Sequence, residues 1–130
     1  MKYNGDIING NKDGFGILEF KDGTKYEGEF KDDKYNGKGK IIYSDKSEYE
    51  GYFHNNLKEE HGIFKWGDGK IYEGEYINNI KEGKGKITFP DGRSYEGNFK
   101  NGELDGEILC FENNKLYKGL FSNGQFIKRL

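Results

Sequence analysis

The chain has 130 residues, and its 21 lysines and arginines against 23 acidic residues give a formal net charge of −2. This near balance, with both signs interleaved along the chain, argues against a nucleic-acid or membrane surface built on bulk positive charge. Only 32 % of the residues are hydrophobic whereas 16 % are aromatic and 21 are glycines, which excludes an aliphatic core and leaves aromatic rings packed over glycine to supply the buried surface.

A tyrosine followed two residues later by glycine recurs along the chain with nearly constant spacing. These tyrosines are Tyr3, Tyr26, Tyr49, Tyr72, Tyr95 and Tyr117, which are separated by 23, 23, 23, 23 and 22 residues. A fixed period of this size is typical of architectures that stack one supersecondary unit on the next. We therefore predict one array, with repeats at 3–25, 26–48, 49–71, 72–94 and 95–116 and a partial repeat at 117–130.

The first predicted strand of each repeat begins at its tyrosine, which we number position 0. Position 2 is glycine in every copy, position 4 is apolar, and the residues between them are mostly acidic, as in Tyr26-Glu27-Gly28-Glu29-Phe30. This alternation has the period of a half-buried β-strand, in which positions 0, 2 and 4 share one face. We expect that face to be aromatic and the opposite face to carry the acids.

A second predicted strand follows in each repeat, with the pattern Gly-x-Gly-x-aliphatic-x-aromatic at positions 11 to 17. In the second repeat its inward residues are Gly37, Gly39, Ile41 and Tyr43. Lysine often stands between them, as at Lys38, so the outer face is expected to pair bases on this strand with acids on the first. We predict eleven strands in a single layer, because the last repeat supplies one strand and a tail.

The parity of the inward positions predicts both turns. Because they are even on the first strand and odd on the second, the first connection must hold an even number of residues or contain a bulge. The second connection keeps parity and fits a three-residue turn with a left-handed glycine, as at Asp22-Gly23. Three repeats depart from the pattern: Lys46 replaces the turn glycine, Glu60 replaces the position-11 glycine, and the fifth repeat lacks one residue, which we place near Gly106.

Residues 72–97 read YEGEYINNIKEGKGKITFPDGRSYEG and resemble the signature of MORN (membrane occupation and recognition nexus) repeats, YEGEWKNGKxHGKGxxxYxDGxxYEG, nearly residue for residue. The resemblance extends over the whole chain, because the glycine and aromatic positions recur together. It implies an all-β fold in which tandem β-hairpins form one elongated, twisted, single-layer antiparallel sheet with a groove lined by aromatics. It also implies a scaffold that dimerises, joins cytoskeletal or axonemal assemblies, binds partner helices or accompanies a catalytic domain. Phospholipid binding has been attributed to the family as well.

Residues that could carry chemistry are few. His54 and His61 are expected to point outward as candidate cross-strand neighbours, but no carboxylate or thiol is placed to complete a metal site. Cys110 is expected to point outward as an unreactive thiol, and as the only cysteine it suits a reducing compartment. The Gly-Lys-Gly-Lys run at 37–40 lacks the spacing and the following helix of a phosphate-binding loop. We therefore predict no catalytic residue, no metal and no cofactor.

The aromatic residues are the one feature for which a function competes with a structural role. They share one face, and the chain has no segment left to cover it. Some rings must fill the space over the glycines, and the rest would form an exposed apolar groove of the kind that marks interaction sites. We predict this groove across the second to fifth repeats and expect Phe111 to point to the same face. The predicted partner-binding residues are Tyr49, Phe53, Trp66, Tyr72, Tyr76, Phe89, Tyr95 and Phe99.

Three functional hypotheses follow. The first is a non-catalytic scaffold or protein-interaction module whose aromatic groove binds an apolar helix or peptide of a partner, or a second copy of the chain. The second is a membrane-surface module for anionic phospholipid, which the near-neutral charge disfavours, since such binding scales with basic clusters at ~1 kcal/mol per Lys or Arg. The third is an accessory repeat region of a larger enzyme. We expect a cytoplasmic protein without a nucleic-acid partner, and the resemblance adds a cytoskeletal or axonemal association.

Overall fold

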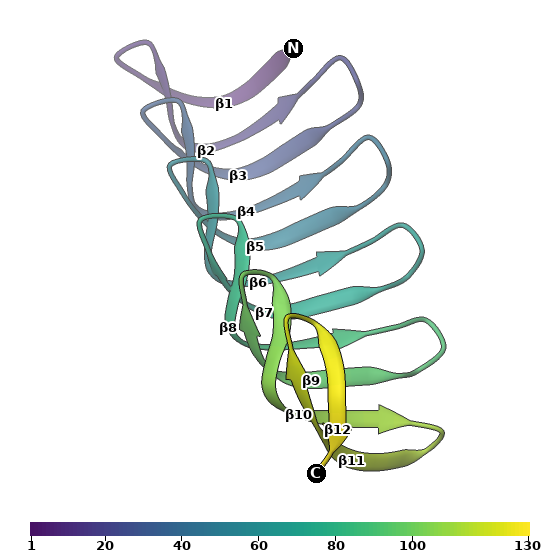
Figure 1. Cartoon of the computed structure of the whole chain (residues 1–130). Helices are drawn as coiled ribbons and strands as arrows, with labels where there is room; N and C mark the ends of the chain where they lie inside the picture. Colours follow the sequence, from purple (N-terminus) through teal and green to yellow (C-terminus); the bar gives the residue numbers. More distant parts are fainter.

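The structure is a computed structural model that describes all 130 residues and is built only of β-strands. They are β1 (Lys2–Ile8), β2 (Asn11–Glu19), β3 (Lys25–Lys31), β4 (Lys34–Ile42), β5 (Glu48–His54), β6 (Leu57–Lys65), β7 (Ile71–Ile77), β8 (Ile80–Thr88), β9 (Ser94–Lys100), β10 (Glu103–Glu112), β11 (Lys115–Ser122) and β12 (Gln125–Arg129). All twelve form one open sheet whose spatial order is the order along the chain. Figure 1 shows the hairpins stacked in a single layer from the N-terminus to the C-terminus. The all-β, single-layer prediction is confirmed, and no helix capable of crossing a membrane is found.

The number of strands is twelve rather than the predicted eleven. The tail after β11 turns back and pairs with it as β12, with Phe126 opposite Phe121. The turn is made by Asn123 and Gly124, whose φ angles are 51° and 77°. Asparagine and glycine tolerate this left-handed conformation, so the tail closes a sixth hairpin instead of remaining a single strand.

The first turn of each repeat has an even number of loop residues and is also followed by a bulge, so both of the possibilities that parity allowed are present. In the second repeat Asp32 and Asp33 form a two-residue turn with φ angles of 49° and 68°. A bulge on β4 follows, because the two steps from Phe30 to Gly28 on β3 oppose four steps on β4. Gly37 lies in this bulge with a φ of 97°. The bulge bends the strand and keeps the inward positions of both strands on the same face.

The second turn is the predicted three-residue turn. The Phe20 amide donates to the Thr24 carbonyl (2.8 Å), which leaves residues 21–23 as the loop, and Gly23 has a φ of 95°. Lys46 adopts the same left-handed conformation with a φ of 77°. Because Lys46 has a Cβ, the second repeat carries local backbone strain there, on the order of 1 kcal/mol.

In the regular repeats the position-0 tyrosine lies across a pair of facing glycines. Gly28 on β3 pairs with Gly39 on β4, and the Tyr26 hydroxyl donates to the Glu29 carbonyl at 2.7 Å. A Cβ added to Gly28 would lie 2.5 Å from the Cα of Gly39 and 2.8 Å from the Tyr26 hydroxyl oxygen. The ring therefore occupies the space that two missing side chains leave, which confirms that aromatic rings pack over glycine.

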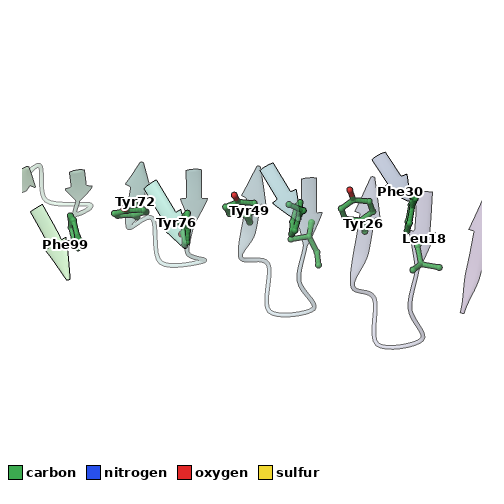
Figure 2. Close-up of a cluster of buried hydrophobic side chains, with 9 residues drawn as sticks. Leu18, Tyr26, Phe30, Tyr49, Tyr72, Tyr76 and Phe99 are labelled. Carbon is green, nitrogen blue, oxygen red and sulfur yellow. The ribbon is translucent and has the colours of Figure 1, made fainter. Parts of the chain in front are cut away.

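Neighbouring repeats interlock through these rings. Each position-0 tyrosine makes an edge-to-face contact with the position-4 aromatic residue of the next repeat. The ring centroids are 5.5 Å apart for Tyr26–Phe53, 5.3 Å for Tyr49–Tyr76 and 5.1 Å for Tyr72–Phe99. Figure 2 shows the labelled side chains following one another in a row along the sheet. Such pairs contribute about 0.5–1.5 kcal/mol each beyond the buried area, so the stability of one repeat depends on its neighbours.

The first turns of successive repeats are also joined, by hydrogen bonds between positions 7 and 9. The Tyr35 amide donates to Oδ1 of Asn56 (2.8 Å), and the Asn56 amide donates to the Tyr35 carbonyl (3.0 Å). Lys58 and Asn79 repeat the same pair of bonds one repeat later. The strand ends on the side of the first turns are thereby held in register by hydrogen bonds between turns as well as by the strand pairing.

The fifth repeat does not lose its residue where we predicted. Gly106 lies in the bulge with a φ of 87°, at the position that Gly37 occupies in the second repeat. Ile108 then pairs with Gly97, as Gly39 pairs with Gly28. The position-13 glycine has therefore been substituted by isoleucine, and no residue is missing before it.

The missing residue lies in the second turn of the fifth repeat. Glu112 pairs with Lys115 across a two-residue turn of Asn113 and Asn114, with φ angles of 51° and 62°. The other second turns have three loop residues.

Two expectations for side chains of β10 are therefore wrong. Cys110 opposes Tyr95 on the aromatic face and is fully buried with Ile108 and Phe121, instead of pointing outward. Phe111 lies on the opposite, outer face, where it lines a shallow hollow with charged residues of β8 and β9. Both errors have the same cause: a deletion placed before these residues inverts the face assigned to each of them.

Candidate interaction surface

The two faces of the sheet differ in chemistry. We call the outer one the charged face, because its strands alternate acids and bases in cross-strand pairs such as Glu27–Lys40 and Glu73–Lys86. A hollow on this face has no hydrophobic residue in its lining. The charged face is therefore suited to solvent contact and strand register.

The opposite, aromatic face is largely filled by its own side chains in the regular repeats. Tyr49 and Tyr72 are fully buried, and Phe53, Tyr76 and Phe99 are at most 5 % exposed. Burial raises the pKa of the Tyr49, Tyr72 and Tyr76 hydroxyls above the ordinary tyrosine range. Five of the eight predicted partner-binding residues thus have a structural role, and Trp66, Phe89 and Tyr95 remain partly exposed.

An apolar hollow on this face, which we call the C-terminal groove, has a volume of about 610 Å³. Its apolar lining consists of Ile87, Phe89, Tyr95, Phe99, Leu104, Tyr117, Phe121 and Phe126. It therefore extends over the fourth to sixth repeats, further toward the C-terminus than the predicted span of the second to fifth.

The C-terminal groove exists because the fifth repeat breaks the tyrosine-over-glycine rule. The buried Ile108 side chain occupies the place where the tyrosine ring would lie over the glycine pair. The Tyr95 hydroxyl instead donates to the carboxylate of Glu112, the residue that stands where other repeats carry an inward aromatic ring. Burial, together with this carboxylate, raises the pKa of Tyr95 to about 12. The groove therefore occupies the space left by the displaced Tyr95 ring and by the aromatic ring that is absent at Glu112.

A second hollow of about 270 Å³, which we call the Trp66 hollow, adjoins this groove. The Trp66 ring packs on Phe64 with centroids 4.6 Å apart. The Lys70 and Lys81 ammonium groups lie 4.4 and 5.2 Å from the Trp66 ring centre. Lys58 lies 5.9 Å from the Phe64 ring centre. Burial lowers the pKa of Lys58 and Lys81, and Lys70 adds to the shift at Lys81.

The structure thus distributes the predicted site residues among three places. Phe89, Tyr95 and Phe99 line the C-terminal groove, and Trp66 and Tyr76 line the Trp66 hollow. The other three, Tyr49, Phe53 and Tyr72, line neither and belong to the core.

Sequence analysis missed the residues at position 9, namely Lys12, Tyr35, Lys58, Lys81, Leu104 and Phe126. Several of them line the two hollows. A signal for them was present, because position 9 has the same parity as the inward positions 11 to 17. Extending the second strand by one inward position would have placed Lys58 and Lys81 on the aromatic face.

The two histidines are not cross-strand neighbours. His54 pairs with Leu57 beside the turn, whereas His61 opposes Glu75 on β7. The Nε2 atom of His61 is 3.6 Å from a carboxylate oxygen of Glu73. The bulge of β6 separates the two residues, which the parity argument alone could not show.

A family model described as MORN repeat matches the chain in five segments, residues 3–25, 26–48, 49–71, 72–92 and 95–107. These segments cover more than half of the chain and begin at the successive position-0 tyrosines. No curated protein was found to match the sequence.

Proposed function

Because the chain belongs to the MORN repeat family, whose repeats are interaction modules, we propose that it is a non-catalytic scaffold that binds a partner protein through its aromatic face. The occupied site is the C-terminal groove, and the bound element is an apolar helix or peptide. The observation that carries this proposal is an apolar hollow of about 610 Å³ with aromatic walls on a sheet that has no second layer.

The groove has the composition of a protein-binding site. Interface anchors are most often aromatic side chains that enter or line a desolvated pocket, and losing one typically costs ~2 kcal/mol or more of binding free energy. Phe126 is 51 % exposed and lines the groove, so it offers apolar surface that a partner can bury. Phe99 and Phe121 are buried residues of the groove lining, and they form the floor of the C-terminal groove.

The test begins with peptides selected from a phage-displayed random library on the immobilised protein. We expect the enriched peptides to carry clustered apolar residues and Phe126→Ala to weaken their binding by ~10-fold or more. Phe15→Ala is the matched control, because Phe15 is similarly exposed (53 %) but lies on the charged face. Equal effects of the two substitutions, or no enriched peptide, would contradict the proposal.

Sedimentation of the isolated protein separates this function from self-association. A second copy in the groove predicts a concentration-dependent dimer that Phe126→Ala dissociates and Phe15→Ala leaves intact. A monomer at all concentrations, with peptide binding retained, assigns the groove to a different protein.

A further inference from the structure

We propose that the C-terminal groove and the Trp66 hollow form one polarised site, which takes a peptide segment carrying acidic side chains beside its apolar ones. The acidic end of the segment lies at the Trp66 hollow and the apolar part lies in the C-terminal groove. This inference rests on the proposed function and specifies the chemistry of the partner.

The two hollows adjoin each other. Lys81 and Gly102 line both of them, so a segment that fills the C-terminal groove reaches the Trp66 hollow without leaving the surface. Lys81 stands at the junction, with its ammonium group 5.2 Å from the Trp66 ring centre and 5.5 Å from that of Tyr72.

Three half-buried lysines at the Trp66 hollow have no acid of their own. Lys58, Lys70 and Lys81 take part in none of the five ion pairs of the structure. A ring face stabilises a nearby cation only in part, and hydrogen bonds to a carboxylate are the stronger interaction. An incoming carboxylate would offset the desolvation that burial imposes on Lys58 and Lys81.

Two other cations on the same face show the contrast. Lys12 lies 5.5 Å from the Tyr3 ring centre and 3.7 Å from a carboxylate oxygen of Asp33. Arg93 also lies over a ring, 4.7 Å from its centre, and binds Asp91 at 2.8 Å. Lys12 and Arg93 are thus paired within the chain, whereas the lysines at the Trp66 hollow are not; Arg129, 4.8 Å from the Tyr117 ring centre, is also without an ion pair.

The charge changes sign along the site. The only carboxylates that line the C-terminal groove are Glu103 and Glu112, and both belong to the fifth repeat. The three lysines belong to the third and fourth repeats. A partner with acids at one end of an apolar stretch is therefore attracted in one orientation and repelled in the other.

An acidic peptide fits these observations better than an anionic membrane surface. Bilayers attract basic residues that are clustered and exposed near the lipid headgroups. Here the lysines are half-buried beside an apolar groove, and the charged face alternates acids with bases.

The experiment uses synthetic copies of the phage-selected peptides and the emission of Trp66, which is the only tryptophan of the chain. We expect the peptides to contain acidic residues on one side of their apolar cluster and to shift the Trp66 emission. Lys58→Gln combined with Lys81→Gln should weaken binding by ~10-fold or more, and raised salt should weaken the wild type more than this variant. Lys84→Gln combined with Lys86→Gln removes the same charge from the charged face and should change the affinity less than twofold.

A double-mutant cycle makes the assignment specific. Replacing the acidic residues of the peptide by their amides should weaken its binding to the wild type ~10-fold. The same replacement should hardly weaken its binding to the variant that already lacks the Lys58 and Lys81 charges. Lys58→Arg with Lys81→Arg keeps the charge and should retain most of the affinity. The peptide arm needs no protein variant, so it decides the question even where a substitution disturbs folding.

The outcomes separate this inference from the proposed function. Peptides whose binding depends on Phe126 but not on the lysines or on their own acids would overturn the polarised site and leave the groove function standing. Absence of any Phe126-dependent peptide would overturn both. Lysine-dependent sedimentation with phosphatidylserine-containing vesicles, without acid-dependent peptide binding, would overturn the inference in favour of a lipid headgroup.

Discussion

The fourth and fifth repeats pair their strands in the same way but cover them differently. In the fourth repeat Gly74 faces Gly85, and the Tyr72 ring lies over both, with its hydroxyl donating to the Glu75 carbonyl at 2.9 Å. The ring is fully buried and becomes part of the sheet's own filling. Nothing on this part of the aromatic face is left for a partner except the side chains at its margin.

In the fifth repeat Gly97 faces Ile108, and the isoleucine fills the space itself. Tyr95 turns to Glu112 and becomes a wall of the C-terminal groove. Isoleucine at position 13 and glutamate at position 17 thus change a self-filled surface into one with room for another molecule. The loss of regularity at one repeat is the physical origin of the candidate site.

Glycine has two different roles in these repeats. At position 13 glycine is needed for space, because a Cβ would collide with the tyrosine ring. At position 11 it is needed for a left-handed backbone, with a φ of 82° at Gly83 and 87° at Gly106. The third repeat carries Glu60 at position 11 with a φ of 58° and keeps its bulge. Substitution at position 11 therefore causes strain, whereas substitution at position 13 changes what covers the sheet.

The largest expected effect comes from filling the glycine pair. A Cβ on Gly74 would lie 2.5 Å from the Cα of Gly85 and 2.7 Å from the Lys84 carbonyl oxygen, and the backbone cannot move away locally. We expect Gly74→Val to lower the free energy of unfolding by ~3 kcal/mol. At Gly97 the nearest atom is Cδ1 of Ile108, at 2.7 Å, which can rotate, and the backbone atoms are further away, with the Glu107 carbonyl oxygen at 2.9 Å and the Ile108 Cα at 3.4 Å. Gly97→Val should therefore cost less, ~1–2 kcal/mol.

Equilibrium urea unfolding measures this difference. Glu73→Thr is the control on the charged face and should stay within ~0.5 kcal/mol of the wild type. Equal losses at Gly74 and Gly97 would mean that the fifth repeat is packed like the fourth, which would remove the explanation given for the groove.

Most of the fold was predictable because a strand has a period of two residues and the chain repeats its pattern. The faces, the turn types and the packing of rings over glycine all follow from that alternation and from steric fit. The fifth repeat was mispredicted because a missing glycine has two explanations, deletion or substitution. The pair Asn113-Asn114 was the deciding signal, since asparagine suits the left-handed conformation that a two-residue turn needs.

The site was less predictable than the fold. Alternation shows which side chains share a face, but it does not show which of them fill the sheet and which remain accessible. Tyr49 and Tyr95 occupy the same position in their repeats, yet one is buried and the other lines the groove. The difference depends on Ile108, a residue on the neighbouring strand that stands where the regular repeats carry glycine.

A smaller effect is expected where a residue with a Cβ occupies a left-handed position. Glu60 has a φ of 58°, whereas the fourth and fifth repeats place glycine there. We expect Glu60→Gly to raise the free energy of unfolding by ~0.5–1 kcal/mol, because the relief of backbone strain exceeds the added flexibility of the unfolded chain. The reciprocal change Gly83→Ala should cost about as much. Thermal unfolding of both variants checks the pair, and a loss on Glu60→Gly would show that its side chain stabilises the bulge in another way.

The smallest expected difference, ~0.5 kcal/mol, lies between the hydroxyls of two tyrosines. Tyr72→Phe keeps the ring but removes the hydrogen bond to the Glu75 carbonyl, which should cost ~1 kcal/mol at neutral pH. Tyr95→Phe removes a hydrogen bond to Glu112 at a partly exposed position and should cost ~0.5 kcal/mol. The two substitutions therefore compare a covered tyrosine of a regular repeat with the displaced tyrosine of the fifth.

Alkaline pH should increase the differences in stability between these variants and the wild type. The direction of the pH dependence follows from the raised pKa values of the two tyrosines. Tyrosine in the unfolded chain ionises near its ordinary pKa of 10.0, whereas burial raises the pKa of Tyr72 and brings that of Tyr95 to about 12. Above pH 10 the folded state retains protons that the unfolded state has lost, so the wild type should lose stability as the pH rises. Burial lowers the pKa of Lys58 and Lys81, so these lysines make stability rise with pH below the ordinary lysine pKa of 10.5. Comparing variants at the same pH cancels their contribution.

Each Tyr→Phe variant should lose stability less steeply above pH 10 than the wild type. For Tyr95 this advantage should stop growing near pH 12, whereas for Tyr72 it should continue to grow. Urea unfolding at a series of alkaline pH values measures both curves, and parallel curves for the two variants would show that the Tyr95 hydroxyl is as well covered as that of Tyr72.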